Sequence, residues 1–383
     1  MPKECLPVFY KNARIFCSDF QFHPGAFSVK DGCFETVLPD SIPEDAVDLA
    51  GATVIPGLID VHTHGNSGAD FSDGDYEGLK KMAAYSAKNG ITGFAPTSMT
   101  LPYEVLAKAF ATGKRLTEEM PAGCARLLGI HMEGPYFSEA KKGAQNGAYL
   151  KNPDFEGFRA LYEGCGGLVR IVDVAPELPG TEDFVKKASK LCTVSVAHTD
   201  ADYEHARTAF QLGATHLTHT FNAMPPISHR APGVIPAAAE NLHVRAELIC
   251  DGKHVHPSAV RLAFALFGGE RMILISDSLR CCGMPEGQYE LGGQQIVLKD
   301  GLARLLDGTV AGSVTNLFDG MVNAIRFGIP EADAIRAATF NPACALGVQS
   351  RYGSIAPGKA ADFIICRSDY TGKRVFLGGQ EIS

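Results

Sequence analysis

Histidines and carboxylates follow several short apolar runs in this 383-residue chain, at the points where strands would end. The first such run ends in Asp60-Val61-His62-Thr63-His64. Side chains two apart on a strand point to the same side, so His62 and His64 can face one site together. Paired imidazoles of this kind either cap or fill a core, or bind a divalent metal. The Pro-Gly before the strand and Gly65 after it favour the metal interpretation.

A carboxylate follows another predicted strand, in the segment Gly129-Ile130-His131-Met132-Glu133-Gly134-Pro135. Glu133 does not belong to a predicted helix, because Gly134-Pro135 forces the chain to turn. A glutamate in a loop is commonly only solvated, but its oxygen atoms are also good ligands for a divalent metal. We predict Glu133 as a metal ligand and leave His131 as a supporting or structural residue.

Two further predicted strands end in histidine, at His198 and at His219. The spacing leaves room for one short helix and one strand, so parallel neighbours would present both imidazoles at one rim. Two neutral imidazoles and one carboxylate form a three-ligand metal site with an open position for water. His216 lies on the opposite face of the strand from His219, and His205 lies inside a predicted helix. Both are therefore expected to be structural.

The last predicted strand of this series ends in Asp277, within Ile273-Leu274-Ile275-Ser276-Asp277-Ser278. An aspartate at a strand end is commonly a turn residue. Beside a metal that activates water, the same carboxylate can act first as general base and then as general acid. Each motif alone is moderate support, but His, Glu, His, His and Asp at five strand ends predict metal-assisted hydrolysis.

Alternating strands and helices must position these residues. A (β/α)8 barrel fits their number and the chain length, and it places active sites at the carboxyl ends of its strands. A doubly wound sheet is the alternative, but the Gly-rich dinucleotide loop that it predicts near the first strand is missing. The predicted strands are Leu58–His62, Ile91–Pro96, Arg126–His131, Leu168–Val174, Thr193–His198, Thr215–His219, Val244–Ile249 and Met272–Ser276; the predicted helices include Tyr76–Lys88, Tyr103–Leu116, Thr181–Lys190, Tyr203–Leu212 and Pro257–Phe267.

Both ends of the chain are rich in residues that favour β-strands. Val8 to Phe16 and Phe27 to Val37 are rich in strand-forming residues, with Pro24-Gly25 and Asp31-Gly32 as expected turns. A turn and a buried strand follow near the C-terminus, up to Cys366. We therefore expect the two ends to pair in one small β-sandwich domain. The predicted division is residues 1–55 and 349–383 for this domain and 56–348 for the barrel.

Composition limits the partners and the compartment. The formal charge of −8 argues against nucleic acid as the general partner, since phosphate backbones need a basic footprint. No apolar segment reaches the length of a membrane span, and the N-terminus lacks the apolar core of a signal peptide, so a cytoplasmic location is expected. The 11 cysteines include no C-x-x-C pair, which favours reduced thiols over a cysteine zinc site.

Together these motifs resemble the amidohydrolase superfamily, and more narrowly the N-acetylglucosamine-6-phosphate deacetylase family. The H-x-H pair alone marks only the superfamily, whereas the E-G-P and F-N-A-M segments are much more specific. The likeness spans nearly the whole chain, through PGLIDVHTHG (56–65), GITGFAPT (90–97), HMEGPY (131–136), KKGAQN (141–146), THTFNAM (218–224) and DGKHV (251–255).

The resemblance implies a homodimer that hydrolyses the acetamide of N-acetylglucosamine 6-phosphate to glucosamine 6-phosphate and acetate, in amino-sugar catabolism. By position, Glu133, His198 and His219 match the ligands of the main divalent metal, and Asp277 matches the catalytic acid/base. His62 and His64 match a second-metal pair, so one or two metals per subunit are expected. Zinc is the first choice of metal, with iron, manganese or cobalt as alternatives.

The resemblance also implies substrate contacts. Asn222 and Ala223 match backbone donors toward the phosphate, and His254 matches a histidine that contacts the sugar. Arg230 matches a phosphate-binding arginine, for which the partner subunit is one source. Gln145 stands where some relatives carry a histidine that polarises the acetyl carbonyl, and Cys281-Cys282-Gly283-Met284 departs from the more usual small residues after the aspartate.

Two other functions stay open on the sequence. A cyclic-amide hydrolase of the dihydroorotase or hydantoinase type would usually place a lysine on a middle strand and lack the E-G-P and F-N-A-M segments. A non-catalytic metal-binding paralogue would have no obvious need for Asp277.

Overall fold

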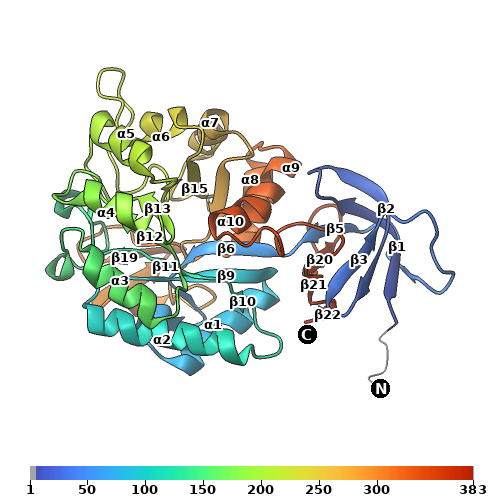
Figure 1. Cartoon of the computed structure of the whole chain (residues 1–383). Coiled ribbons are helices and arrows are strands. Elements are labelled where there is room, and N and C mark those ends of the chain that lie inside the picture. Colours follow the sequence, from blue (N-terminus) through green and yellow to red (C-terminus); the bar gives the residue numbers. More distant parts are fainter. Residues whose placement is uncertain (1–5, 383) are drawn as a thin grey trace.

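Eight parallel strands form the centre of the computed structural model, which describes residues 6–382 (Figure 1). Each strand pairs with the next one along the chain, and the third is split into two short pieces. All eight predicted strands are present. They are β6 (Leu58–Thr63), β9 (Ile91–Ser98), β10 (Arg126–Leu127) with β11 (Ile130–Met132), β12 (Val169–Val174), β13 (Thr193–Val196), β14 (His216–Leu217), β15 (Arg245–Ile249) and β16 (Met272–Ile275).

The last strand of this series returns to the first and closes a barrel. The backbone N–H of Asp277 donates to the carbonyl of His62 at 2.9 Å, and the Ser276 hydroxyl donates to Asp60 Oδ2 at 2.6 Å. Ser278 continues the contact as an isolated parallel bridge to Thr63. The closure confirms the predicted (β/α)8 barrel and excludes the open doubly wound sheet.

Helices cover the outside of the barrel, one after each strand (Figure 1). Aspartates at positions 75, 154 and 202 begin three of them by accepting hydrogen bonds from the first free N–H groups. Three predicted helices have the expected bounds, whereas α2 extends to Glu119 and α4 ends at Ala188. The helices are α1 (Tyr76–Lys88), α2 (Tyr103–Glu119), α3 (Phe155–Gly164), α4 (Thr181–Ala188), α5 (Tyr203–Leu212), α6 (Val234–Glu240), α7 (Pro257–Phe267) and α8 (Leu317–Arg326), followed by α9 (Glu331–Ala338) and α10 (Phe340–Ala345).

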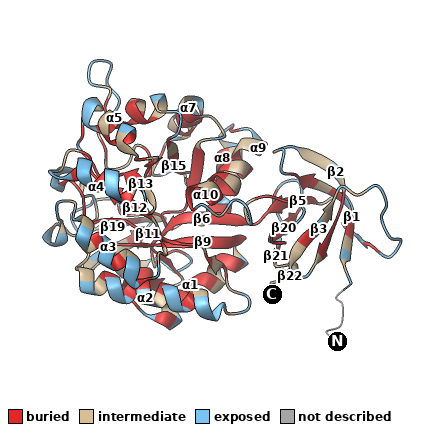
Figure 2. Ribbon diagram, in the orientation of Figure 1, coloured by how far each residue is buried: buried red, intermediate tan, exposed pale blue. Residues whose placement is uncertain are grey.

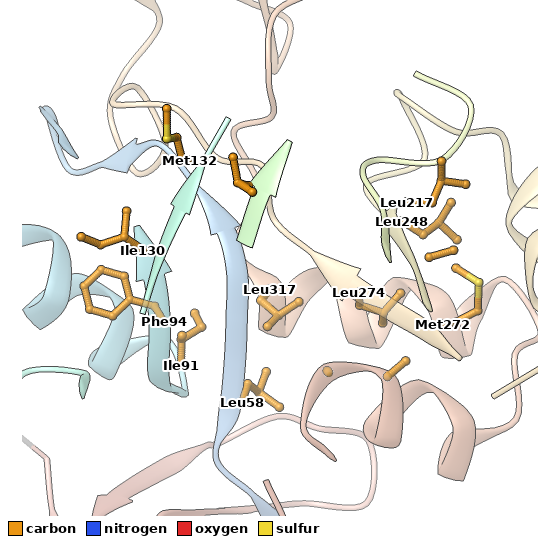
Figure 3. Close-up of a cluster of buried hydrophobic side chains, with 14 of the residues drawn as sticks. Leu58, Ile91, Phe94, Ile130, Met132, Leu217, Leu248, Met272, Leu274 and Leu317 are labelled. Carbon is orange, nitrogen blue, oxygen red and sulfur yellow. The ribbon is translucent and has the colours of Figure 1, made fainter. Parts of the chain in front are cut away.

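Alternation along the strands divides the apolar side chains between two cores. Leu58, Phe94 and Leu274 belong to the larger core between strands and helices, part of which Figure 3 shows. Ile59 and Ile273, one position away, belong to a smaller core with residues of α10. Each such buried side chain contributes about 1.5–3 kcal/mol. The barrel strands are therefore almost entirely buried, while the helices keep an exposed outer face (Figure 2).

The two ends of the chain share a second sheet beside the barrel, as expected (Figure 1). It folds over an aromatic core in which the Phe363 and Phe376 rings stack at 4.4 Å. The N-terminal strand β5 pairs directly with the C-terminal strand β20. The strands are β1 (Val8–Phe16), β2 (Phe22–Lys30), β3 (Cys33–Val37), β4 (Val47–Asp48), β5 (Thr53–Pro56), β20 (Phe363–Cys366), β21 (Arg374–Leu377) and β22 (Gln380–Glu381). The residue boundaries given above for the domains remain a prediction.

One expected turn in this sheet is wrong. Pro24-Gly25 lies inside β2, where Pro24 pairs with Arg14. Strand β3 pairs with β2 only from Phe27 onward, so one edge of β2 is free at Pro24. A free edge tolerates the missing N–H of proline. Asp31-Gly32 does form the turn between β2 and β3.

A small antiparallel sheet between β16 and α8 was not predicted. It consists of β17 (Gly287–Leu291), β18 (Gln294–Lys299) and β19 (Leu302–Leu305). Its apolar side packs on Met99 and Leu279 at the carboxyl end of the barrel. Two shorter strands, β7 (Gly65–Asn66) and β8 (Ala69–Asp70), pair with each other after β6.

Two expectations about the chain as a whole can be checked on residues 6–382. All ten cysteines in this range are free thiols, as predicted, and Cys5 lies outside it. None of the helices in this range combines the length and the apolar composition that crossing a membrane requires.

Candidate active site and metal centre

The residues predicted as ligands of the main metal meet at the carboxyl ends of three strands. Oε1 of Glu133 lies 3.2 Å from Nε2 of His198 and 3.1 Å from Nε2 of His219. Glu133 is buried, which alone would raise its pKa, but the surrounding imidazoles outweigh burial and hold the pKa well below its ordinary value. Glu133 is therefore an ionised carboxylate in contact with both histidines.

The predicted second set lies against the first. Nε2 of His64 is 3.3 Å from Oδ1 of Asp277 and 3.3 Å from Oε2 of Glu133. Nε2 of His62 is 3.5 Å from Oε1 of Glu133 and 3.6 Å from Oδ1 of Asp277. Burial would raise the pKa of Asp277, but His62 and His64 outweigh it and bring the pKa below its ordinary value. Glu133 thus stands between the two sets.

Both sets fit a divalent metal. In each, three side chains bring one ligand atom apiece within 4.8 Å of one another: Glu133, His198 and His219 in one, and His62, His64 and Asp277 in the other. Nε2 of His62 is buried without a hydrogen-bond partner although it faces two carboxylates, as expected for a nitrogen that binds a cation. Imidazole and carboxylate donors suit zinc, iron, manganese or cobalt.

The backbone at three of these residues is left-handed. The φ angles are 43° at His198, 27° at His219 and 46° at Asp277. A positive φ costs a residue with a Cβ about 1–3 kcal/mol, and such residues gather at functional sites. Here each one lies at the end of its strand and turns its side chain onto the barrel mouth.

Hydrogen bonds orient two of the imidazoles toward the metal position. Nδ1 of His198 donates to the carbonyl of Lys141 at 2.9 Å, and Nδ1 of His62 donates to Oε2 of Glu247 at 2.9 Å. In both rings the other nitrogen, Nε2, is left to face the metal position. Sequence reasoning missed Glu247, although an acidic residue inside the apolar run Ala246-Glu247-Leu248-Ile249 was a usable signal.

The other histidines of this region have protein partners of their own or lie on the surface, and their structural role remains a prediction; His131 also lies within 4.8 Å of ligand atoms of His62 and Glu247. His216 is buried and its Nε2 donates to Oε1 of Glu247 at 2.9 Å. His131 is buried, and its Nε2 donates to Oδ1 of Asp173 at 2.8 Å. Burial would lower the pKa of His131, but Asp173 outweighs it and raises the pKa to about 9. His205 lies on the outer surface of α5.

A cavity of about 270 Å³ opens above both sets. Four of the five predicted substrate-binding residues line it: Gln145, Asn222, Ala223 and His254. Arg230 is exposed and does not line this cavity; it lies beside another groove, with Tyr203 and Gly233. Within this chain the cavity therefore lacks the predicted arginine.

Gln145 and His254 are both held by neighbours. Nε2 of Gln145 donates to Oε2 of Glu133 at 2.5 Å, and its Oε1 accepts from the N–H of Thr100 at 2.8 Å. Nδ1 of His254 donates to Asp251 at 2.7 Å, and Nε2 donates to the carbonyl of Ala311 at 3.0 Å. The orientation of the Gln145 amide is fixed by these two bonds.

The unpredicted sheet and the segment after it form one wall of the cavity, with Leu291, Val310 and Gly312 among the lining residues. A Cβ at Gly312 would lie 2.6 Å from the carbonyl oxygen of Asp277 and 2.8 Å from its Oδ1. Only glycine allows this segment to pass so close to the carboxylate. Sequence reasoning missed Gly312, because nothing near it in the chain indicates the contact.

Known proteins are similar to this chain over nearly its whole length. Residues 53–382 match the Amidohydrolase family. The chain is 36% identical over 353 residues to the N-acetylglucosamine-6-phosphate deacetylase of Bacillus subtilis (strain 168), covering 90% of this chain and 89% of that one. It is 31% identical over 356 residues to the N-acetylgalactosamine-6-phosphate deacetylase of Escherichia coli O157:H7, covering 92% of this chain and 93% of that one.

A solved structure agrees with both matches. It is a mutant of the N-acetyl-D-glucosamine-6-phosphate deacetylase of Mycobacterium smegmatis in complex with N-acetyl-D-glucosamine-6-phosphate. Its TM-score to this chain is 0.93 at 29% identity, with 99% of this chain and 100% of that chain covered. The chain belongs to the amidohydrolase family and, within it, to the branch of the N-acetylglucosamine-6-phosphate deacetylases.

Proposed function

We propose that this chain hydrolyses the acetamide of N-acetylglucosamine 6-phosphate to glucosamine 6-phosphate and acetate, in amino-sugar catabolism. The observation that carries the proposal is the meeting of Glu133, His198 and His219 with Asp277 in one cavity. Its relatives of similar length are named for this reaction or for that of the galactosamine isomer.

We propose zinc as the metal, with one or two ions per subunit. Glu133, His198 and His219 would hold the main ion, and His62 and His64 a second one beside Asp277. A divalent cation supplies Lewis acidity there, which lowers the pKa of water toward neutrality and polarises an amide carbonyl.

Asp277 moves the proton. An aspartate is ionised near neutral pH, and His62 and His64 favour the ionised form of Asp277, so its carboxylate can accept a proton from the attacking water. The same proton then passes to the sugar nitrogen as the bond between carbon and nitrogen breaks. An amine leaves poorly unless it is protonated, so both transfers are needed. The products are the free amine and acetic acid, which gives its proton to the amine or to solvent and becomes acetate, and Asp277 returns to its ionised form.

Other residues position the substrate. Asn222 and Ala223 would donate to the phosphate, and His254 would contact the sugar. We propose a cytoplasmic homodimer in which Arg230 of the partner subunit supplies the guanidinium that this cavity lacks; its planar fork suits a phosphate. Binding the phosphate far from the amide holds the acetyl group in place for attack.

The cyclic-amide alternative lacks support. It predicts a lysine on a middle strand, and none of the described residues that line the cavity is a lysine.

A substrate panel tests the proposal. The chain, loaded with zinc, is given N-acetylglucosamine 6-phosphate, N-acetylgalactosamine 6-phosphate and unphosphorylated N-acetylglucosamine, and acetate is measured. We expect release from the first at the highest kcat/KM and at least about tenfold less without the phosphate. Faster release from the galactosamine isomer would reassign the substrate, and release from none would contradict the proposal.

A further inference from the structure

Glu247 of β15 lies beneath the metal centre, inside the barrel, and none of its surface is exposed. A buried charge of this kind is costly unless it is fully paired. Glu247 is not used in the chemistry proposed above, so its place in the barrel needs another explanation.

The two carboxylate oxygens of Glu247 have defined partners. Oε2 accepts from Nδ1 of His62 at 2.9 Å and from the backbone N–H of His219 at 3.2 Å. Oε1 accepts from Nε2 of His216 at 2.9 Å. One side chain therefore contacts a member of each metal set, the ring of His62 in one and the backbone of His219 in the other.

The bond to His62 decides which ring nitrogen is available. With Nδ1 donating to Glu247, Nε2 faces Glu133 and Asp277 and has no hydrogen-bond partner. A carboxylate behind a ligating histidine fixes both the tautomer and the ring orientation. The bond from the backbone N–H of His219 to Glu247 lies at a residue with left-handed backbone, whose φ is 27°.

We propose that Glu247 is a positioning residue for the metal centre, which holds His62 so that its Nε2 can bind the cation. The inference rests on the metal centre of the proposed function but not on its substrate. Removing the carboxylate would leave the His62 ring free to rotate, and metal affinity would fall although no ligand is lost.

Zinc affinity tests this directly. The zinc bound per chain is measured against a series of chelator-buffered zinc concentrations for the wild type, Glu247→Ala and Glu247→Gln. We expect 10- to 100-fold weaker binding of the most weakly held zinc in Glu247→Ala. Glu247→Gln keeps an acceptor oxygen for Nδ1 of His62 and should recover most of this loss. Affinity of Glu247→Ala within about threefold of the wild type would overturn the proposal.

Asp173→Ala is the matched control. Asp173 is equally buried and also accepts from an imidazole, but that imidazole is His131, which belongs to neither metal set of the site. An equal loss of affinity in this control would show a general effect of barrel packing and would overturn the inference.

A double-mutant cycle with His62→Ala tests whether Glu247 affects zinc binding through His62. If Glu247 acts through His62, the change Glu247→Ala weakens zinc binding far less when His62 is already absent. Additive losses would overturn the proposal.

Should the Glu247 variants not fold, the wild-type chain labelled with ¹⁵N-histidine provides the test. We expect a signal from a hydrogen-bonded Nδ1–H that disappears in His62→Asn, and its absence counts against the proposal. Acetate release is measured separately, so a chain that binds zinc in this way but releases no acetate would contradict only the proposed function.

Discussion

Two local features hold the carboxylate of Asp277 at the proposed reaction centre. Its backbone is left-handed, and Gly312 passes close to its carboxylate. In Asp277→Asn the amide cannot accept the proton, so kcat should fall by about 10²–10⁴-fold. The main zinc should stay bound, because Glu133, His198 and His219 are unchanged. Turnover like that of the wild type in a zinc-loaded sample would refute the assignment.

Gly312 offers a test of the close approach to Asp277. A methyl group there must move the segment or the carboxylate, because its position is 2.6 Å from the Asp277 carbonyl oxygen. We expect Gly312→Ala to lower kcat by at least about tenfold and to destabilise the fold by about 1–3 kcal/mol. Gly164→Ala is the matched control, since a Cβ at Gly164 meets nothing within 4 Å. Equal effects of the two substitutions on kcat would contradict the argument.

Among single residues, the sequence predicted side chains that lie at the ends of their own strands. His198 and Asp277 follow apolar runs that can be recognised without knowledge of any partner. The apolar run around Glu247 indicates a buried acid, but its partners, like the close approach of Gly312 to Asp277, depend on neighbours brought together only by barrel closure. Arg230 was identified through the resemblance alone, and its position outside the cavity of this chain does not follow from the local sequence.

Among the elements, the barrel strands were the most predictable, because buried parallel strands form continuous apolar runs. The sheet of β17 to β19 has signals that were not used: Gly292-Gly293 joins its first two strands and Asp300-Gly301 the next two. Its position over the cavity depends on tertiary contacts, such as the bond from Nε2 of Gln294 to the carbonyl of Ala144 at 2.7 Å.

An ion pair joins the sheet of the chain ends to the helices of the barrel. Arg14 of β1 donates to both oxygens of Glu331 at the start of α9, at 3.0 and 2.6 Å, and the Tyr370 hydroxyl adds a third bond at 2.5 Å. Burial would raise the pKa of Glu331, but these donors outweigh it and bring the pKa below the ordinary value. The pair is partly exposed, so we expect Glu331→Gln to cost only about 0.5–1 kcal/mol near neutral pH.

The stabilisation of the fold by this ion pair should decrease at acid pH. Because the folded pKa of Glu331 is lowered, its stabilisation is fully present above the ordinary pKa of a glutamate and is lost as the pH falls through the folded value. The difference in thermal midpoint between the wild type and Glu331→Gln should therefore shrink on acidification. Glu156→Gln, in an exposed pair with Arg159, is the control. A difference that grows toward acid pH would contradict the sign.

For the whole molecule, the proposed dimer makes a prediction about Arg230. If each site uses Arg230 of the partner subunit, Arg230→Ala and Asp277→Asn homodimers are both impaired. A mixed dimer then has one site with an intact Asp277 and an intact arginine. Refolding the two variants together should restore about a quarter of the wild-type activity, since half of the dimers are mixed and each has one complete site. No gain over the separate homodimers would place Arg230 in its own subunit or outside the site.

The central claim is that side chains far apart in the sequence meet around a cation on which hydrolysis depends. The most direct test removes the metal with a chelator, returns zinc in measured steps, and records acetate release from N-acetylglucosamine 6-phosphate together with the zinc bound per chain. We predict almost no release without metal, and a rise that follows bound zinc and ends at one or two ions per chain. Full release by the metal-free chain, or none at full loading, would contradict the account.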